Sequence, residues 1–267
     1  MTTSPRSIVR NNIREKFARD EVVASMIVRL VRSVEIARVA KTAGFDSLYV
    51  DLEHNQFSLD TTSQICMAAL SAGITPLVRV PSNTPEYIAR VLDGGALGII
   101  APHVHTAEEA RQVVRYAKYP PVGERSSGGP MAALEYRSFP LAEANAALND
   151  ATMVVAMIES KEGLANVEEI VAVDGIDMLL IGANDLCGEF GIPGQYGDPK
   201  IKDAIAKVIQ AARKKGKHVG LGGLGSRPDL IAEFVKLGAR YVSIGSDLNF
   251  MLDGCAERAK SVHALKT

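Results

Sequence analysis

The stretch TMVVAMIESKEGLANVEEIVAVDGIDMLLIGANDLCG, residues 152–188, contains two apolar runs that each end in a carboxylate. Glu159 follows the first run, and Asp185 follows the second. Both runs are rich in Val, Ile, Leu and Met, which is typical of strands buried on both faces in a parallel sheet. The segment between them has the apolar spacing of an amphipathic helix. The stretch therefore predicts a β-α-β unit with an acid at the tip of each strand.

These two acids are the predicted metal ligands. The carboxyl ends of parallel strands share one face of an α/β fold, so Glu159 and Asp185 should converge there. Two carboxylates on an apolar rim repel each other unless a cation lies between them, and a hard divalent cation with oxygen ligands fits best. Each acid alone is better explained as a residue that begins or caps a helix, and it is the pair that favours a metal site. His103 and His105 are rival ligands that would favour Zn or Fe, although such histidines are more often structural.

The pattern of this stretch recurs along the chain. A helix that ends in Ala-Gly or Gly-Ala is followed by a short apolar run and then by polar residues. Together with the runs at 22–28 and 152–158, the repeats give eight strands, which predict a closed (β/α)8 TIM barrel as a single domain over residues 1–267. The predicted helices cover residues 33–43, 58–71, 84–93, 106–117, 161–172, 200–215, 226–238 and 247–264.

Two segments depart from this repeat. Residues 1–21 contain a polar leader in which 7–21 has the pattern of a short amphipathic helix, and we expect it to cap the base of the barrel. Residues 118–150 are rich in Pro, Gly and Ser. This composition predicts a long irregular excursion before a short helix, and we expect it on the active face because loops of this length are often functional.

Composition excludes several classes of function. A net charge of -1 with 5% aromatic residues provides no basic stripe, so nucleic acid is not an expected partner. No apolar run approaches the roughly 20 residues of a membrane span, and the N-terminus lacks the apolar region of a signal peptide. Cys66, Cys187 and Cys255 show no CxxC spacing, which favours free thiols in a reducing compartment. We therefore expect a cytoplasmic protein with small-molecule ligands.

Polar residues at other strand ends are candidates for catalysis. His54 ends the segment DLEH, where a mostly neutral imidazole is suited to act as a general base, although it could instead cap a helix. Arg79 ends an apolar strand in LVRVP, and a cation there suits anion recognition or stabilisation of an oxyanion. Asp93 ends a predicted helix, where an acid is electrostatically unfavourable; it is either solvated or paired with a partner such as His54.

Two other chemistries are less well supported. No Lys lies within a predicted strand, so a Schiff-base aldolase mechanism lacks its nucleophile. Glycines 222, 223 and 225, with Gly245 and Ser246, resemble the phosphate-binding loops of barrels, but without a helix in the right context the pattern is weak. These glycines could instead let backbone amides approach a substrate carboxylate.

Taken together, the strand-end motifs resemble the HpcH/HpaI aldolase family, the metal-dependent class II pyruvate aldolases. The similarity is collinear from about residue 22 to the final helix. It is carried by DLEH (51–54), LVRVP (77–81), GALGIIAPHVHTAEEAR (95–111), YPPVGERS (119–126), MIES (157–160) and IGANDL (181–186).

The resemblance implies a barrel that binds Mg²⁺, Mn²⁺ or Co²⁺ and catalyses reversible aldol cleavage of a 4-hydroxy-2-oxo acid to pyruvate, or hydroxypyruvate, and an aldehyde. It assigns His54 as the base, Asp93 as the carboxylate that raises its basicity, and Arg79 as the stabiliser of the transition state. It also implies that Glu159 and Asp185 hold the metal.

The same resemblance bears on substrate and assembly. Asn184 is expected to contact substrate, and Met157 stands where Gln is frequent. Arg29-Leu30-Val31-Arg32 stands where Trp-Leu-Gly is frequent, which leaves the substrate open. Family members form hexamers, as trimers of dimers, with the last helix swapped between partners, and the spacing of Leu248, Met251, Leu252 and Cys255 suits a buried helix. Oxaloacetate decarboxylation, cleavage of a CoA thioester and a non-catalytic carboxylate-binding barrel are the alternatives.

Overall fold

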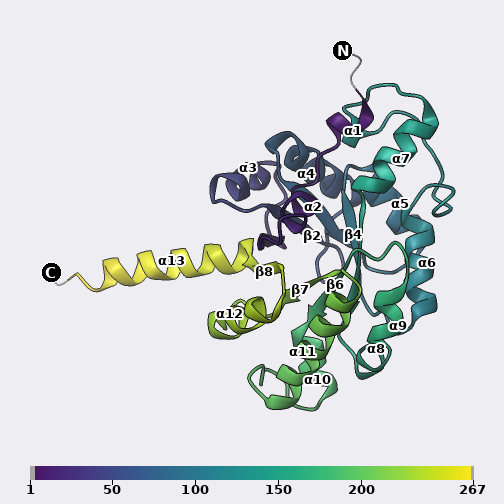
Figure 1. The fold of residues 1–267 in the computed structure, drawn as a ribbon. Coiled ribbons are helices and arrows are strands. Elements are labelled where there is room, and N and C mark those ends of the chain that lie inside the picture. The colour runs from purple at the N-terminus through teal and green to yellow at the C-terminus, as the bar shows by residue number, and fades with distance from the viewer. Residues whose placement is uncertain (1–3, 266–267) are drawn as a thin grey trace.

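Eight parallel strands form a closed barrel in the computed structural model, which describes residues 4–265 (Figure 1). Each strand pairs with the next along the chain, and β1 pairs with β8. The predicted TIM barrel is therefore confirmed. The strands are β1 (Val23–Val28), β2 (Ser47–Asp51), β3 (Thr75–Arg79), β4 (Gly98–Ala101), β5 (Met153–Ile158), β6 (Met178–Gly182), β7 (His218–Gly222) and β8 (Tyr241–Ser246).

Helices surround the barrel and connect its strands (Figure 1). They are α1 (Pro5–Ile8), α2 (Asn12–Phe17), α3 (Glu35–Thr42), α4 (Leu59–Ala72), α5 (Pro85–Asp93), α6 (Ala107–Ala117), the 3-10 helix η1 (Ala132–Leu134), α7 (Leu141–Ala151), α8 (Lys161–Ala165), α9 (Val167–Ala172), α10 (Ala183–Glu189), α11 (Pro199–Lys214), α12 (Pro228–Leu237) and α13 (Asp247–His263).

Apolar side chains fill two layers. Successive side chains of a strand point to opposite faces, so Leu77 lies in the cluster inside the barrel whereas Val78 lies in the cluster between strands and helices. The inner cluster also holds Tyr49 and Tyr241, and the Tyr241 hydroxyl donates to Ser25 Oγ over 2.7 Å. The inside of the barrel is thus a packed core, and the polar strand ends above it are left for function.

The leader closes the amino-terminal end of the barrel, as expected, but it forms two short helices where the sequence predicted one. Asn11 separates them because its backbone is extended and its side chain accepts hydrogen bonds from the backbone N–H groups of Ile13 and Arg14. Ile13 and Phe17 of α2 join the inner cluster, and the ring of Phe17 stacks on His218, with 3.9 Å between ring centroids.

The expectation that residues 118–150 lie on the active face is wrong. This segment follows α6 and precedes β5, so it connects a helix to a strand and lies at the end of the barrel where the strands begin. Accordingly, the buried Lys118 donates to Asn149 O over 2.7 Å, next to the start of β5. The segment contains η1 and the predicted short helix, α7, and it packs beside α1.

Two helix predictions also need correction. The helix predicted at 161–172 is divided into α8 and α9, because the backbone of Asn166 leaves helical geometry and its side chain donates to His105 O over 2.8 Å. The short helix α10, directly after β6, was not among the predicted helices.

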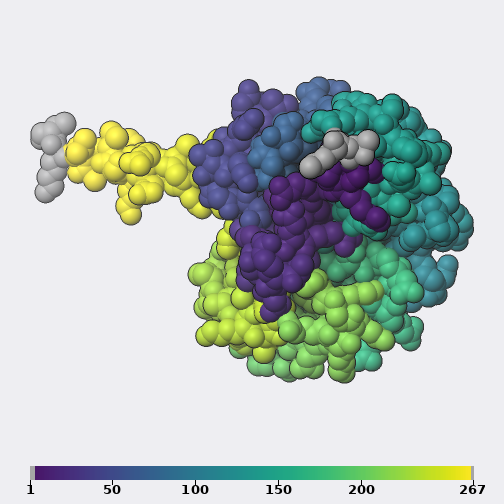
Figure 2. All heavy atoms as spheres, turned by 45° about the horizontal axis from the view of Figure 1, so that its top comes forward, coloured from purple at the N-terminus to yellow at the C-terminus, as the bar shows by residue number. Residues whose placement is uncertain are grey.

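Helix α13 extends away from the barrel (Figures 1 and 2). Its first residue, Asp247, is buried, whereas Leu248, Met251 and Leu252 are exposed. The sequence predicted a buried helix here, but within a single chain the apolar side of α13 is exposed. Within residues 4–265, no helix combines the length and the apolar character needed to cross a membrane.

Candidate active site

The two predicted metal ligands lie at the ends of adjacent strands. Glu159 directly follows β5, and Asp185 lies in the first turn of α10, directly after β6. These strands pair in parallel, with Ile158 opposite Ile181. The β-α-β unit therefore brings both carboxylates to the same edge of the barrel, at its carboxyl end.

The carboxylate of Glu159 is in an environment that favours a cation. Its side chain is only 3% exposed, and Oε1 accepts the backbone N–H of His103 over 2.7 Å, whereas the buried Oε2 has no hydrogen-bond partner. Burial raises the pKa of Glu159, and the charges of Glu53 and Asp185 raise it further, against the opposing effect of His103. A buried oxygen without a partner, next to a second acid, fits a hard divalent ion.

Such an ion would have few protein ligands. Among residues 4–265, no three His, Cys, Asp or Glu side chains are grouped so that they could hold a metal together. Glu159 and Asp185 would therefore supply two carboxylate oxygens, and the other coordination positions would be left to water or substrate. This is the usual arrangement for Mg²⁺, which keeps several of its waters.

Asp51 and Arg79 form a buried ion pair next to this edge. Arg79 donates from Nε to Asp51 Oδ1 over 2.9 Å and from Nη2 to Oδ2 over 2.7 Å. Burial opposes ionisation of both groups, but their mutual hydrogen bonds and charges outweigh it, so the pKa of Asp51 is lowered and that of Arg79 is raised. Arg79 is thus a fixed cation, as the sequence predicted.

Glu53 and His103 extend these contacts towards the predicted metal site. Arg79 Nη1 lies 2.8 Å from Glu53 Oε2, and Glu53 Oε1 lies 2.8 Å from His103 Nε2. His103 Nδ1 in turn lies 3.1 Å from Glu159 Oε1. The ends of β2, β3 and β5 are therefore joined by one series of polar contacts. His105, the other rival ligand, has a structural contact instead, between its Nδ1 and Ser160 Oγ at 2.8 Å.

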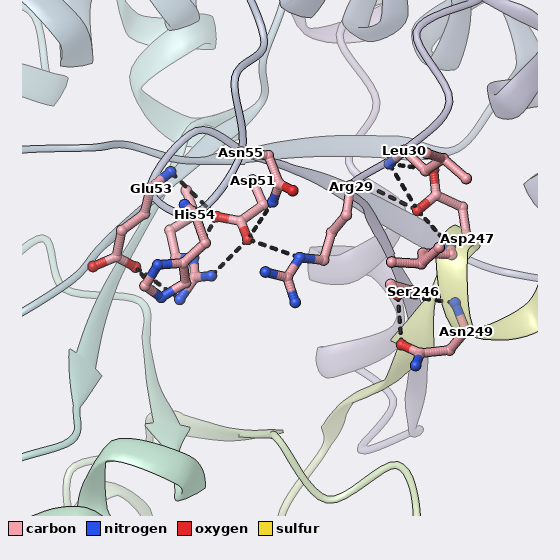
Figure 3. A network of polar contacts seen from close by, with 11 residues as sticks. Arg29, Leu30, Asp51, Glu53, His54, Asn55, Ser246, Asp247 and Asn249 are labelled. Carbon is pink, nitrogen blue, oxygen red and sulfur yellow. Dashed lines mark hydrogen bonds and ion pairs between the residues drawn. The ribbon is translucent and has the colours of Figure 1, made fainter.

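His54 faces the open mouth of the barrel. Its side chain is 51% exposed, and its Nε2 lies 3.6 Å from Glu53 Oε2. Its backbone N–H donates to Asp51 Oδ1 over 3.3 Å, which fixes the start of the loop that carries it (Figure 3). The structure therefore brings His54, Arg79, Glu159 and Asp185 to one end of the barrel.

Asp93 is not part of this group within one chain. It ends α5, at the opposite end of the barrel, and Arg125 Nη2 donates to its Oδ1 over 2.6 Å. The Arg125 side chain is 2% exposed and Asp93 is 47% exposed. Because helices and strands of the barrel run in opposite directions, the end of a helix and the end of a strand cannot share a face. The expected contact of Asp93 with His54 is not made within residues 4–265.

The two predicted substrate-binding residues occupy different depths. Asn184 is exposed beside Asp185, and its Oδ1 accepts the Tyr196 hydroxyl over 2.6 Å. Met157 is buried inside the barrel, below Glu159. Gly182 makes room for both Met157 and Glu159, because a Cβ at Gly182 would lie 2.9 Å from Met157 Cε and 2.7 Å from Glu159 Oε2. The Met157 side chain therefore lies directly beneath Glu159, the predicted metal ligand.

The sequence predicted no role for Asp51 or Glu53, and it marked Arg29 only as part of a segment that bears on the choice of substrate. Asp51 and Glu53 belong to the same strand end as His54, and Asp51 is in register with Arg79 on the neighbouring strand. The sequence signal for the ion pair was the presence of two acids at the end of one strand and an arginine at the end of the next strand. For Arg29, the signal was a charged residue directly after the first apolar run.

A large cavity lies away from these residues. It has a volume of about 770 Å³ and is located at the amino-terminal end of the barrel, between the leader, α4 and residues 132–136. Charged side chains there pair with each other, as Lys16 Nζ does with Asp46 Oδ2 over 2.7 Å. None of the candidate catalytic residues lines this cavity, so its size is not evidence about the reaction.

Comparisons with known proteins agree with the site. A family model described as HpcH/HpaI aldolase/citrate lyase matches residues 25–253. A 4-hydroxy-4-methyl-2-oxoglutarate aldolase of Chaetomium globosum is 37% identical over 255 residues, which cover 94% of this chain and 95% of that protein. A 2-keto-3-deoxy-L-rhamnonate aldolase of Escherichia coli is 31% identical over 252 residues, which cover 94% and 93%.

A solved structure shows the same fold at similar identity. The crystal structure of an HpcH/HpaI aldolase from Desulfitobacterium hafniense is similar to this chain with a TM-score of 0.88 and 30% identity, over 95% of this chain and 97% of that one. The named relatives are aldolases and thus carbon-carbon lyases, the class that the sequence predicted. The motifs, the barrel and these matches agree, and the chain belongs to the HpcH/HpaI aldolase/citrate lyase family.

Proposed function

We propose that this chain is a divalent-metal-dependent aldolase that reversibly cleaves a 4-hydroxy-2-oxo acid to pyruvate, or hydroxypyruvate, and a second carbonyl compound. The observation that carries the proposal is the buried Glu159 oxygen without a partner, next to Asp185 and on the same face as His54 and Arg79. The names of the relatives support it, since both describe cleavage of 2-oxo acids.

Glu159 and Asp185 would hold Mg²⁺, Mn²⁺ or Co²⁺. When bound, the ion supplies a Lewis acid next to the 2-oxo group, which acidifies the hydrogens on the adjacent carbon. The remaining work belongs to the side chains. Met157 closes the floor of this part of the mouth, and Asn184 and Arg79 contact the bound 2-oxo acid.

His54 transfers the proton at the carbon next to the 2-oxo group. In the synthetic direction its neutral imidazole removes a proton from the methyl group of pyruvate, directly or through a water. In the cleavage direction the same imidazole returns a proton to that carbon. Its exposed position at the mouth allows both steps. Arg79, held rigidly by Asp51 and Glu53, stabilises the negative oxygen that develops on the 2-oxo group without having to reorganise.

Asp93 can support His54 only from another copy of the chain, because the two residues lie at opposite ends of one barrel. We propose that the protein forms a hexamer, as a trimer of dimers, and that α13 packs on a neighbour in it. The exposed apolar residues of α13 support this assembly. The free state of Cys66, Cys187 and Cys255 supports a cytoplasmic location.

The proposal is tested by a cleavage screen. Pyruvate release is measured from 4-hydroxy-2-oxo acids of different length, before and after treatment with EDTA and after adding back Mg²⁺, Mn²⁺ or Co²⁺. Oxaloacetate and CoA thioesters are included as rival substrates. We expect cleavage that EDTA abolishes and a divalent ion restores, whereas cleavage unaffected by EDTA would contradict the metal-dependent mechanism.

A further inference from the structure

We infer that Arg29 is a specificity-determining residue that binds a second carboxylate of the substrate, so that the preferred substrate is a 4-hydroxy-2-oxo diacid. The inference rests on the proposed function and names its substrate class. The second carboxylate is the one that leaves with the carbonyl product. Three observations carry this inference: a fixed backbone, a guanidinium without a hydrogen-bond partner, and the distribution of charge across the mouth.

The backbone of Arg29 is held by a single buried carboxylate. Asp247, which is 5% exposed, accepts the N–H groups of Arg29 over 2.9 Å and of Val31 over 2.8 Å, and it also accepts that of Leu30 (Figure 3). Asp247 begins α13 next to the end of β8, and β8 pairs with β1. Arg29 therefore starts from a rigid position on the rim, which lowers the entropy cost of using its side chain to bind a ligand.

The guanidinium of Arg29 has no counterion of its own. Its nearest carboxylate atom is Asp51 Oδ2, 3.5 Å from Nε, and Nε is buried without a hydrogen bond (Figure 3). Asp51 is already occupied, because it accepts two hydrogen bonds from Arg79 and one from Asn55 over 3.0 Å. Within residues 4–265 the Arg29 side chain makes no hydrogen bond that meets the usual geometry, and it is 37% exposed. Its planar fork is therefore available to a ligand.

The neighbouring Arg32 shows the contrast. Its Nη2 donates to Gln56 O over 3.3 Å, and its guanidinium lies over the ring of Phe57, 5.5 Å from the ring centroid. Arg32 is thus engaged in the loop after β1, whereas Arg29 reaches the Asp51–Arg79 pair at the mouth. Of these two cations, Arg29 is the one placed to meet a substrate.

The distribution of charge indicates an anion. Arg79 neutralises Asp51 and also contacts Glu53, and a divalent ion would neutralise Glu159 and Asp185. The carboxylate next to the 2-oxo group would bind at the metal end of the mouth. Arg29 then remains as a cation at the β1 end of the mouth, and a carboxylate matches its two parallel N–H donors better than a neutral hydroxyl does.

The reaction on such a diacid needs no further reactant. The bond between C3 and C4 breaks, its electron pair remains on C3, and the C4 hydroxyl passes its proton to His54, directly or through a water, as the oxygen becomes a carbonyl; His54 then returns the proton to C3. Protonation of C3 gives pyruvate. When C4 carries the second carboxylate, the other product is also a 2-oxo acid, which Arg29 would hold during release.

A matched pair of substrates tests this inference. 4-Hydroxy-2-oxoglutarate and 4-hydroxy-2-oxopentanoate have chains of equal length and differ by a carboxylate in place of a methyl group. In the metal-loaded enzyme we expect higher kcat/KM for the diacid. In Arg29→Met we expect kcat/KM for the diacid to fall about 10-fold to 100-fold, which is typical of losing a hydrogen bond between charged groups, while kcat/KM for the monoacid changes less than about 3-fold.

Control variants separate this effect from a change of fold. Arg32→Met should leave the preference unchanged, Arg29→Lys should restore part of it, and the melting temperatures of all variants should agree with that of the unmodified protein. A preference for the monoacid in the unmodified protein, or an undiminished preference for the diacid in Arg29→Met, would overturn the role of Arg29.

A binding measurement keeps this inference apart from the aldolase proposal. 2-Oxoglutarate and 2-oxopentanoate lack the 4-hydroxyl and cannot be cleaved, so calorimetry in the presence of Mg²⁺ reports recognition alone. We expect 2-oxoglutarate to bind at least about 10-fold more tightly, and Arg29→Met to abolish the difference. If neither hydroxy acid is cleaved but this preference holds, the aldolase proposal fails and the role of Arg29 stands. If the two oxo acids bind equally, the role of Arg29 fails.

Discussion

Asp51 lies between the two arginines at the mouth of the barrel and determines how each of them is paired. It is fully buried and accepts two hydrogen bonds from Arg79, so that removing either partner leaves a buried charge with a weaker ion pair. Arg29 approaches the same carboxylate to 3.5 Å but forms no hydrogen bond with it. A single acid therefore sets the difference between an arginine that is fixed in the structure and one that is available to a ligand.

The change Asp51→Asn should lower the free energy of unfolding by about 1–3 kcal/mol, because Arg79 loses two buried hydrogen bonds to a carboxylate and keeps only Glu53 as a counterion. The pKa of Asp51 is lowered in the folded state, so its stabilising effect is present above the pKa of an unfolded aspartate, about 3.9, and is lost as the pH falls below it. Urea titrations at several pH values measure this difference between the two proteins.

The matched control for Asp51→Asn is Asp203→Asn, at an exposed position of α11. We expect it to change the free energy of unfolding by less than about 0.5 kcal/mol at every pH. Equal losses for the two variants at neutral pH would contradict a stabilising role of the Asp51–Arg79 pair.

His54→Ala should reduce kcat for cleavage by about 10²–10⁴-fold, which is the usual contribution of a general base. The side chain is half exposed and lies 3.6 Å from Glu53 Oε2, so we expect the melting temperature and the affinity for Mn²⁺ to be retained. Steady-state kinetics and Mn²⁺ binding followed by electron paramagnetic resonance measure the two properties. Cleavage at an undiminished rate would show that another group moves the proton.

At the scale of elements, the junction of β6 and α10 forms part of the predicted metal site. Gly182 ends β6, and a Cβ there would lie 2.7 Å from Glu159 Oε2 and 2.8 Å from Glu159 Cβ. These distances are too short for a nonbonded contact. The absence of a side chain at the end of one strand therefore allows the acid of the neighbouring strand to occupy its position.

Gly182→Ala should weaken Mn²⁺ binding and lower the cleavage rate at limiting metal, because the new methyl group displaces the Glu159 carboxylate. The matched control is Gly188→Ala in α10, where an added Cβ would meet no atom within 4 Å. We expect the control to bind Mn²⁺ like the unmodified protein. Equal Mn²⁺ affinity in the two variants, measured by calorimetry, would contradict the role of Gly182.

Most elements could be predicted from the sequence because six of the eight apolar runs are preceded by a glycine near the end of a helix. Gly73, at a φ of +72°, ends α4 and marks where β3 begins. The errors arose where side chains override that pattern, as Asn11 does in dividing the leader and Asn166 in dividing α8 from α9. The face of residues 118–150 was mispredicted because loop composition does not distinguish the two ends of a barrel.

The candidate site was predictable only in part. A residue directly after an apolar run must lie at the carboxyl end of the barrel, which correctly located His54, Arg79, Glu159 and Asp185. Which side chains pair with each other depends on their geometry in the fold, and the spacing of residues along the sequence does not reveal it. For this reason the contact of Arg79 with Asp51 was not foreseen, nor was that of Asp93 with Arg125.

At the scale of the whole molecule, the two ends of the barrel carry different parts of the proposed catalytic machinery. His54 lies at the mouth, whereas Asp93 lies at the base, half exposed beside Arg125. The apolar side chains of Leu248, Met251 and Leu252 in α13 are also exposed within one chain. Both features are explained if the functional unit contains more than one copy.

Mixing two inactive variants should therefore restore activity. His54→Ala lacks the base but retains Asp93, and Asp93→Asn lacks the acid but retains His54, so a mixed assembly contains some sites with both residues intact. After mixing under conditions that allow subunits to exchange, we expect up to about one quarter of the unmodified activity, measured as pyruvate release. Activity no higher than the sum of the two separate variants would show that each site is built from one chain.

The opposite placement of His54 and Asp93 also constrains how two copies can meet. A two-fold axis perpendicular to the barrel axes sets neighbouring barrels antiparallel, so that the mouth of each lies beside the base of the other, and both sites are completed by one contact. In such a pair an Asp93→Asn copy impairs the site of its neighbour, whereas its own site is completed by the neighbour's intact Asp93. Asp93→Asn copies expressed beside an equal number of normal ones would then leave the number of complete sites unchanged and place about half of them on the variant chains.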